Sequence, residues 1–259
     1  MPLNKVSPTA QIGRNVTIGD FTIIHDNVVI GDGSTIDSHC VVGYPSRLAL
    51  KKTVVIGPNS TVRSHSVIYE GCTFGERLTT GHAVHIRENT QAGRYVQVGT
   101  NSDIQGDCVL GNFVKLHSEV HISKASRVGD FVWIYPRTQF TNDPFPPSHI
   151  VESILVDDLA VIATNTLVLP GIRIGLASFV AAGSVLRAHV PDLHCVGGVP
   201  AKTFATIDRF YNMKYNLGAP WPSHYRDAYP PESQPLLDVI LTRVNAAIEL
   251  RRIERENAA

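Results

Sequence analysis

A six-residue repeat limits what this chain can fold into more than any other feature of its sequence. Within residues 56–140, every sixth position belongs to one set, and all members except Thr80 and Ala92 are large and apolar. This period matches neither the 3.6-residue repeat of a helix nor the two-residue alternation of a strand. It is typical of a parallel β-helix, in which three hexads make one coil. We expect the apolar residue to point into the coil and a following glycine, such as Gly57, to turn the corner at least steric cost.

The repeat extends on both sides of this stretch, with two shifts of frame. It begins at Val6, ends at Leu186 and amounts to 28 hexads, or about nine coils. The shifts fall at residues 44–53 and between Phe140 and Val156. Because insertions between coils form loops outside the β-helix, the sequence predicts one loop at each place.

The C-terminal part of the chain has helical spacing instead. Between positions 234 and 256, one helical face is apolar, and it carries Leu236, Leu237, Ile240, Leu241, Val244, Ile248 and Ile253. We expect a shorter helix at residues 203–217. Residues 221–231 are expected to form an ordered crossing segment, since flexible linkers are rarely aromatic. The chain should therefore have a β-helix domain at residues 1–203 and an α-helical region at residues 204–259.

Composition and cysteine usage narrow the functional classes. The formal net charge is zero, which argues against a nucleic-acid binder driven by bulk electrostatics. No apolar run approaches the roughly 20 residues that span a bilayer, and no signal peptide is expected at the N-terminus. Cys72 and Cys108 should lie two coils apart, at about 9–10 Å, which is too far for a disulfide. With Cys40 and Cys195 we expect them to be reduced, as in a cytoplasmic protein.

The end of the repeat resembles the closing signature of hexapeptide-repeat acyltransferases that use acetyl-CoA. It contains V-A-A-G-S-V-L from Val180, V-P from Val190 and V-G-G-V-P-A-K from Val196. The resemblance implies a left-handed β-helix, a homotrimer with active sites between subunits, and acetyl-CoA as co-substrate without a metal. It also implies a CoA site near the end of the repeat, formed by Ala163, Ala181, Gly183, Arg187, Pro200 and Lys202.

A closer similarity is to N-acetyltransferases of nucleotide-linked amino sugars, notably the dTDP-3-amino-3,6-dideoxyhexose group. It rests on H-I-S-x-x-S-x-V-G-D-F-V-W-I from His121 and on T-N-D-x-x-P from Thr141. This similarity implies transfer of an acetyl group to a sugar amine for surface polysaccharide synthesis. The expected partners are then the two small-molecule substrates.

Two other enzyme classes and a scaffold role remain as alternatives. The UDP-N-acetylglucosamine O-acyltransferases of lipid A synthesis share the β-helix, but their catalytic histidine corresponds to Gly106 in I-Q-G-D-C, and they lack the V-G-G-V-P-A-K ending. A zinc site like that of the γ-carbonic anhydrases could use His85, His117 and His121. A non-catalytic β-helix would bind no acetyl-CoA.

Residues 18 apart should stack on successive coils at about 4.8 Å. This places His85, Asp103, His121 and Gln139 in one column. Titratable groups in a row are costly unless they are solvated, paired or used. The column is either a solvated polar ladder or one wall of the active site, in which Asp103 orients a histidine.

The proton acceptor is open among three possibilities. His121 is one, since the reference pKa of histidine lies near working pH. Asp143 is another, and the departing CoA sulfur is the third. Asn142 and Asp143 begin a proline-rich loop, where they serve either as turn residues or as ligands of the acceptor amine.

Several further residues are candidate substrate contacts. Arg47, in a loop with Lys51 and Lys52, could bind a diphosphate bidentately or be simply solvated. His117 and Tyr135 should be neighbours that line either the sugar pocket or a subunit interface. Glu119 falls in a column with Asn101 and Arg137, where an ion pair is the simpler expectation. Arg63 completes the set of substrate-binding candidates.

Overall fold

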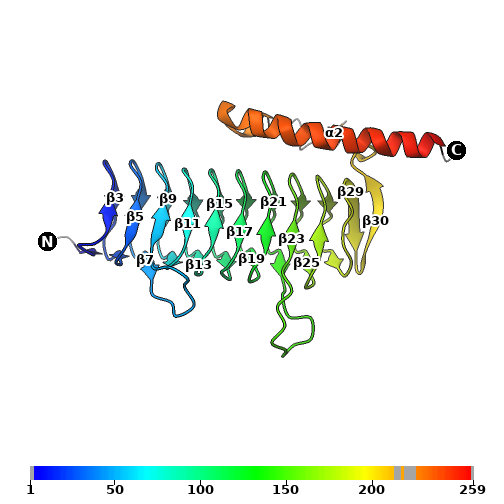
Figure 1. Ribbon diagram of the computed structural model, residues 1–259. Coiled ribbons are helices and arrows are strands. Elements are labelled where there is room, and N and C mark those ends of the chain that lie inside the picture. Colours follow the sequence, from blue (N-terminus) through cyan, green and yellow to red (C-terminus); the bar gives the residue numbers. More distant parts are fainter. Residues whose placement is uncertain (1–2, 213–216, 219–225, 258–259) are drawn as a thin grey trace.

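The computed structural model describes residues 3–212, 217–218 and 226–257 of the chain (Figure 1). It is a left-handed parallel β-helix with a long helix lying along it. Within the described residues, short parallel strands form three sheets, which we name A, B and C in the order in which each coil visits them. Each coil therefore has an A–B edge, a B–C edge and a C–A edge.

The strands are short in all three sheets. Sheet A is formed by β1 (Lys5–Val6), β4 (Ile23–Ile24), β7 (Val41–Tyr44), β10 (Val67–Tyr69), β13 (His85–Ile86), β16 (Asp103–Ile104), β19 (His121–Ile122), β22 (Gln139–Phe140), β25 (Leu167–Val168) and β28 (Val185–Leu186). Sheet B is formed by β2 (Gln11–Ile12), β5 (Val28–Ile30), β8 (Val54–Ile56), β11 (Thr73–Phe74), β14 (Gln91–Ala92), β17 (Val109–Leu110), β20 (Arg127–Val128), β23 (Leu155–Val156) and β26 (Arg173–Ile174). Sheet C is formed by β3 (Thr17–Ile18), β6 (Thr35–Ile36), β9 (Thr61–Val62), β12 (Thr79–Thr80), β15 (Gln97–Val98), β18 (Lys115–Leu116), β21 (Trp133–Ile134), β24 (Val161–Ile162), β27 (Phe179–Val180), β29 (His194–Gly198) and β30 (Ala201–Thr206).

From Ile24 onward the large hexad residues form the core, as the sequence predicts, whereas Val6 and Ile12 of the first coil are exposed. Ile86 pairs with Ile104, and Ile104 pairs with Ile122, so the inward residues of successive coils lie in register. All three are buried and belong to one apolar cluster that fills the β-helix. The predicted loops are confirmed as well, and both leave the A–B edge, one after β7 and one after β22 (Figure 1).

The prediction that the glycine after the inward residue turns the corner is wrong. The left-handed backbone conformation falls two residues later, at Asn59 rather than Gly57. Gly57 is needed because a Cβ atom there would lie 2.4 Å from the backbone of Gly75 on the next coil. Close approach between coils, rather than the turn itself, therefore selects glycine at this position.

The estimate of nine coils is slightly low. In the described part of the chain, the three sheets contain ten, nine and eleven strands. The chain continues past Leu186, because Val190 bridges to Ile174 and β29 pairs with β27. Val180 pairs with Val196 there, a spacing shorter than the usual coil, so the six-residue period does not reveal this last turn.

The long helix α2 (Gln234–Asn257) confirms the predicted C-terminal helix. It follows the 3₁₀ turn η1 (Pro231–Ser233) and covers the B–C edge. Its buried residues pack on apolar side chains of that edge, including Phe113 and Phe131, in a second cluster outside the coils. Ile253, predicted to lie on the apolar face, is 44% exposed.

The shorter helix predicted at residues 203–217 is wrong. β30 extends through Thr206 and pairs antiparallel with β29, and the hairpin of β31 (Tyr211–Asn212) and β32 (Leu217–Gly218) follows. Of the predicted crossing segment, residues 221–225 lie outside the described residues. Its later part is ordered: the Tyr229 hydroxyl donates to the carbonyl of Phe113 at 2.7 Å.

The four cysteine side chains lie in the interior of the protein. Cys40, Cys72, Cys108 and Cys195, all within the described residues, are buried and form no disulfide, as the spacing of Cys72 and Cys108 predicts for that pair. Burial raises the pKa of the Cys72 and Cys108 thiols to about 12. None of the helices in the described ranges is long and apolar enough to cross a bilayer.

Candidate functional site

The predicted column of polar residues lies on the outer face of sheet A. Strand register places His85 beside Asp103, Asp103 beside His121, and His121 beside Gln139. The two loops border this face at the A–B edge. The column is therefore open to a ligand on the face of sheet A and flanked by both insertions.

His121 and Asp103 form the central pair of the column. Nδ1 of His121 lies 3.1 Å from Oδ2 of Asp103, and about a third of each side chain is exposed. Gln105 donates to the same carboxylate oxygen at 2.6 Å. Partial burial alone would raise the pKa of Asp103, but the hydrogen bonds from His121 and Gln105 outweigh it and leave the pKa below its usual value. The carboxylate is thus ionised and holds Nδ1 of His121, which leaves Nε2 as the ring nitrogen that Asp103 does not engage.

The ends of the column contribute less. Gln139 donates to the backbone carbonyl of Glu119 at 3.3 Å rather than to His121. His85 is exposed and adjoins Asp103 through strand pairing, and its charge is the smallest of the influences that lower the pKa of Asp103. At the neighbouring C–A edge, Arg137 donates to Glu119 at 3.1 Å, and both side chains are more than half exposed. This is the ion pair that the sequence favours for Glu119.

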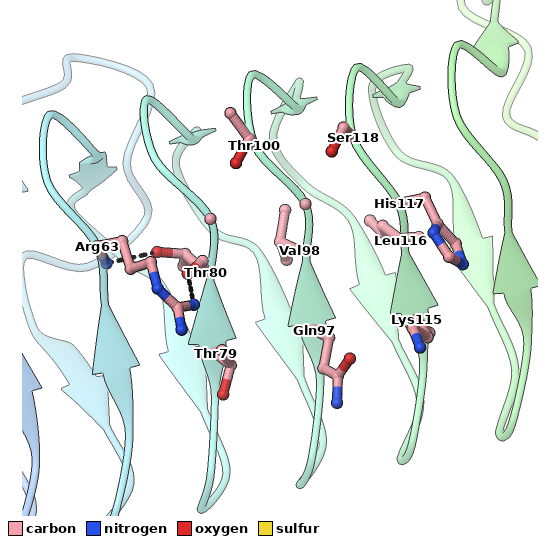
Figure 2. Close-up of a pocket in the computed structure, with 12 residues that line it drawn as sticks. Arg63, Thr79, Thr80, Gln97, Val98, Thr100, Lys115, Leu116, His117 and Ser118 are labelled. Atoms are coloured by element: carbon pink, nitrogen blue, oxygen red, sulfur yellow. Dashed lines mark hydrogen bonds between the residues drawn. The ribbon is translucent and has the colours of Figure 1, made fainter. Parts of the chain in front are cut away.

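A shallow hollow of about 230 Å³ lies on sheet C, across the C–A edge from His121 and Asp103 (Figure 2). Gly81 and Gly99 form part of its lining, and His117 closes one end. The ring of Tyr135 stacks on that of His117 with centroids 4.4 Å apart, as predicted. At the opposite end, the Arg63 guanidinium donates to the carbonyl of Thr80 at 2.8 Å.

His117 is chemically unusual within this hollow. Its Nε2 atom is buried and has no hydrogen-bond partner within the described part of the chain. Burial, and to a lesser degree the charge of Lys115, lowers the pKa of His117. Because a protonated ring would bury a charge without a partner, His117 is expected to be neutral at physiological pH.

This low pKa predicts a pH effect on stability. The unfolded chain takes up the His117 proton before the folded chain does, so stability should be lost as pH falls from above about 6.5 through the lowered pKa. His117→Phe keeps the ring stack and removes this proton. Its Tm should fall less than that of the wild type between pH 7.5 and 5.5. Equal losses in both proteins would show that His117 does not contribute to the acid sensitivity.

The second loop uses Asp143 to hold its own shape. The Asp143 carboxylate accepts from the Ser148 hydroxyl at 2.5 Å, the Ser148 amide at 2.7 Å and the Phe145 amide at 2.9 Å. These three hydrogen bonds lower the pKa of Asp143, and the bond from the Ser148 hydroxyl contributes most. Asn142 precedes it, and its carbonyl accepts from the Glu152 amide at 2.9 Å. The carboxylate therefore has the turn role that the sequence allows.

The candidate CoA residues lie on the last coils. Ala163 and Ala181 continue the edge of sheet C that carries His117 and Tyr135, since strand pairing stacks these positions. Gly183 lies in the turn after β27, and Arg187 is exposed directly after β28. Pro200 and Lys202 belong to the exposed hairpin of β29 and β30. Past Tyr135, this edge therefore carries small residues toward the C-terminal end of the β-helix.

Three polar contacts are not among those predicted from the sequence. Gln105 shares an outward face with Asp103 because alternate strand residues point to the same side, and this spacing is visible in the sequence. The Lys115 ammonium lies 4.7 Å from the centre of the Trp133 ring, beside the hollow. Glu88 is buried beneath the first loop. Its partner in that loop is Ser46, which is 42 residues away in the sequence, so the six-residue repeat does not indicate this contact.

A metal site is one of the alternatives for the histidines. Among residues 3–212, 217–218 and 226–257, no three histidine, cysteine, aspartate or glutamate side chains gather so that they could hold a metal ion. Within one chain, the zinc alternative that combines His85, His117 and His121 thus finds no structural support.

Comparisons with known proteins agree with the repeat and the fold. Residues 9–44 match the family model described as bacterial transferase hexapeptide (six repeats). The 2,3,4,5-tetrahydropyridine-2,6-dicarboxylate N-acetyltransferase of Brevibacillus brevis is 35% identical over 72 residues, which are 28% of this chain and 30% of that protein. The enzyme of the same name from Enterococcus faecalis is 40% identical over 63 residues, which are 24% of this chain and 26% of that protein. The matches thus span less than a third of these curated relatives.

Solved structures of low sequence identity also cover most of the chain. The UDP-N-acetylglucosamine acyltransferase of Arabidopsis superposes with a TM-score of 0.63 at 17% identity, over 79% of this chain and 73% of that one. At this identity the similarity establishes a common fold.

Proposed function

We propose that this protein transfers an acetyl group from acetyl-CoA to the amine of a nucleotide-linked amino sugar. The observation that carries the proposal is the pairing of His121 with an ionised Asp103 on an open sheet face between two loops. Such a pair presents an imidazole nitrogen of fixed orientation to an acceptor. We propose 3-amino-3,6-dideoxyhexoses linked to dTDP as the first acceptors to test.

The proposed reaction needs alignment and one proton acceptor. The neutral amine attacks the thioester carbonyl carbon, and a backbone N–H stabilises the resulting oxyanion. Nε2 of His121 accepts the amine proton while Nδ1–H remains bonded to Asp103. The carbon–sulfur bond then breaks, and the CoA thiolate takes up a proton. The products are an N-acetyl sugar and CoA.

The other two proton acceptors are less well supported. Asp143 accepts three hydrogen bonds within its loop, and its pKa is lowered, so it is a weak base. We assign Asn142, next to it, the role of aligning the amine. Direct uptake by the CoA sulfur needs no protein residue, and loss of His121 separates that route from ours.

The relatives support N-acetylation over O-acylation. The two curated matches are both called N-acetyltransferases. This chain shares its fold with the Arabidopsis acyltransferase of a UDP-sugar, and O-acylation of such a sugar is the second candidate function. Gly106 stands where those O-acyltransferases carry their histidine, and the V-G-G-V-P-A-K ending from Val196 indicates CoA. We further propose that three chains assemble and place His117 and Tyr135 near a neighbouring chain.

Isothermal titration with acetyl-CoA tests the co-substrate. Binding is expected, and Lys202→Ala should weaken it by about tenfold, the effect of one charge-assisted hydrogen bond. Lys202 is exposed, so the Tm of the variant should stay close to that of the wild type. No heat of binding in the wild-type protein would favour the scaffold alternative, and zinc found by elemental analysis would favour the carbonic-anhydrase type.

A further inference from the structure

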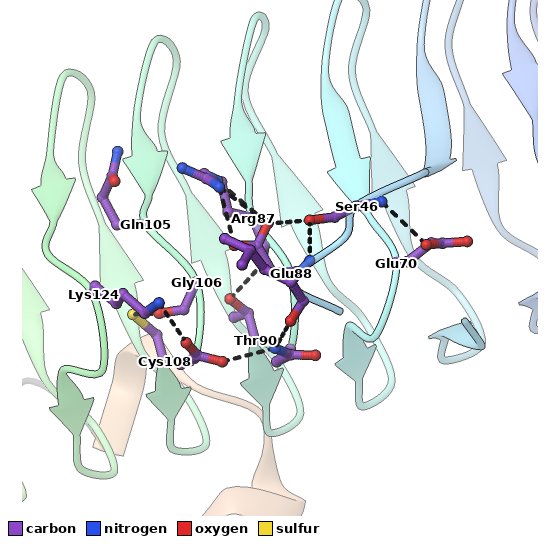
Figure 3. Close-up of polar contacts among 12 residues, drawn as sticks. Ser46, Glu70, Arg87, Glu88, Thr90, Gln105, Gly106, Cys108 and Lys124 are labelled. Carbon is purple, nitrogen blue, oxygen red and sulfur yellow. Dashed lines mark hydrogen bonds and ion pairs between the residues drawn. The ribbon is translucent and has the colours of Figure 1, made fainter. Parts of the chain in front are cut away.

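We propose that Glu70, Glu88 and Asn89 form a latch that positions the loop of residues 44–53, and with it Arg47, beside the acceptor site. The loop leaves the β-helix after β7 but is fastened further along, on the coil that carries His85 (Figure 3). The role of Arg47 as a phosphate ligand rests on the proposed function. The latch itself does not.

Two acidic residues on successive coils hold Ser46. Its amide donates to Oε2 of Glu70 at 3.1 Å, and its hydroxyl donates to Oε2 of Glu88 at 3.2 Å. Glu70 and Glu88 are 18 residues apart, so they stack at the A–B edge in the register of the strands. Both donors of one serine are therefore used to fix the loop to the β-helix.

Glu88 is unusual because its side chain is only 2% exposed. A buried carboxylate is costly unless it is paired and hydrogen-bonded. Arg87 donates to Oε1 at 3.0 Å, and the Ser46 hydroxyl is the contact that reaches it from the loop. Removing the Ser46 hydroxyl would take one hydrogen bond from a desolvated charge, which is why this contact should matter more than an exposed one.

Gly106 makes room for this arrangement. Its φ angle is +93°, and a Cβ atom there would lie 3.0 Å from the carbonyl oxygen of Glu88 and 3.3 Å from its Oε1. A histidine at this position would crowd Glu88. Glycine at this position therefore leaves the space that Glu88 occupies in the latch.

Asn89 fastens the next part of the loop. Its amide group accepts from the Leu50 N–H at 2.8 Å and donates to the Leu48 carbonyl at 3.0 Å, as a neighbouring strand would. The same group donates to Asp107 at 2.7 Å, and Asp107 pairs with Lys124 at 3.2 Å. The loop is therefore joined to a polar network that continues along the A–B edge toward the second loop.

Arg47 lies between these two anchors. Ser46 and Leu48, its neighbours in sequence, are both held, whereas the exposed Arg47 side chain has no hydrogen-bond or ion-pair partner among the described residues. Because the backbone on both sides is already held, the loop itself needs no further ordering when the guanidinium binds a phosphate bidentately. The geometry thus suits Arg47 to a phosphate group of the nucleotide.

Limited digestion with trypsin tests the latch without any assumption about catalysis. The loop offers cleavage sites after Arg47, Lys51 and Lys52. Ser46→Ala should raise the rate of cleavage there by about tenfold, because a hydrogen bond to a charged group is lost. Ser46→Thr retains the hydroxyl and should be cleaved at the wild-type rate. Equal rates for all three proteins at equal Tm would overturn the latch.

Kinetics test whether the latch acts through Arg47. Ser46→Ala should raise the KM for the nucleotide sugar by about three- to tenfold and leave the KM for acetyl-CoA unchanged. The double variant with Arg47→Ala should be no worse than Arg47→Ala alone, since the two changes remove one interaction. Additive losses would overturn the link to Arg47. A protein that releases no thiol with any acceptor would overturn the proposed function, while the trypsin result would still decide on the latch.

Discussion

Replacing His121 with asparagine is expected to lower kcat by about 10²–10⁴-fold, the usual range for loss of a general base. Asparagine is a close match for the structural role, because its amide N–H can still donate to Asp103. It cannot accept the amine proton. The KM values should therefore change little, and circular dichroism should show an intact fold.

A second variant, at Asp103, separates this effect from simple misplacement. Asp103→Asn provides the partner test, since a neutral amide no longer fixes the Nδ1–H tautomer and kcat should fall as well. If His121→Asn and Asp143→Asn each retain activity within about tenfold of the wild type, neither is an essential base. Proton uptake by the CoA sulfur would then be the better account.

Ile68→Ala is expected to cost about 2–5 kcal/mol of folding stability, the range for truncating a buried isoleucine. Ile68 is fully buried inside the coil and pairs in register with Ile86 on one side and Val42 on the other. Alanine would leave a cavity that the stacked coils cannot easily close, because the backbone hydrogen bonds on both sides fix their spacing.

Val67→Ala is the matched control for this change. Val67 lies on the same strand but faces outward and is partly exposed, so its truncation should cost below about 1 kcal/mol. Urea unfolding of both variants at one protein concentration gives the comparison. A loss for Ile68→Ala no greater than that for Val67→Ala would contradict the assignment of the hexad residue to the interior.

The six-residue period is enough to predict the β-helix and its column of candidate site residues. In a stack of coils, the backbone hydrogen bonds between coils fix the register, so a residue 18 positions away must be a neighbour. This is why the pairing of Asp103 with His121 follows from their spacing in the chain. The two shifts of frame locate the loops for the same reason.

Contacts outside the period could not be predicted. Phe113 and Phe131 lie on the B–C edge, where α2 and Tyr229 return to pack in the same apolar cluster. The contact of Ser46 with Glu88 depends on the path of a loop that the repeat does not determine. Residues 203–206 are predicted to be helical but belong to β30, since the pairing of that strand with β29 comes from tertiary context rather than from local propensity.

The position of glycine shows how a correct pattern can have a different cause. Glycine follows the inward residue because the next coil passes too close for a Cβ atom, as at Gly57. Most left-handed corners are occupied by other residues, such as Asn59, which tolerates that conformation, although glycine occupies some of them, as at Gly33 and Gly71. The sequence alone does not distinguish a glycine required by the close approach of the next coil from one required by a left-handed corner.

A thiol-release assay with acetyl-CoA and a panel of nucleotide sugars tests the central claim most directly. Each amino sugar in the panel is paired with the same sugar bearing a hydroxyl in place of the amine. We predict CoA release with at least one amino sugar, a product heavier by one acetyl group, and no release with its hydroxyl partner. Release with the hydroxyl sugars alone, or with no member of the panel although acetyl-CoA binds, would contradict the assignment of this protein as an N-acetyltransferase of nucleotide-linked amino sugars.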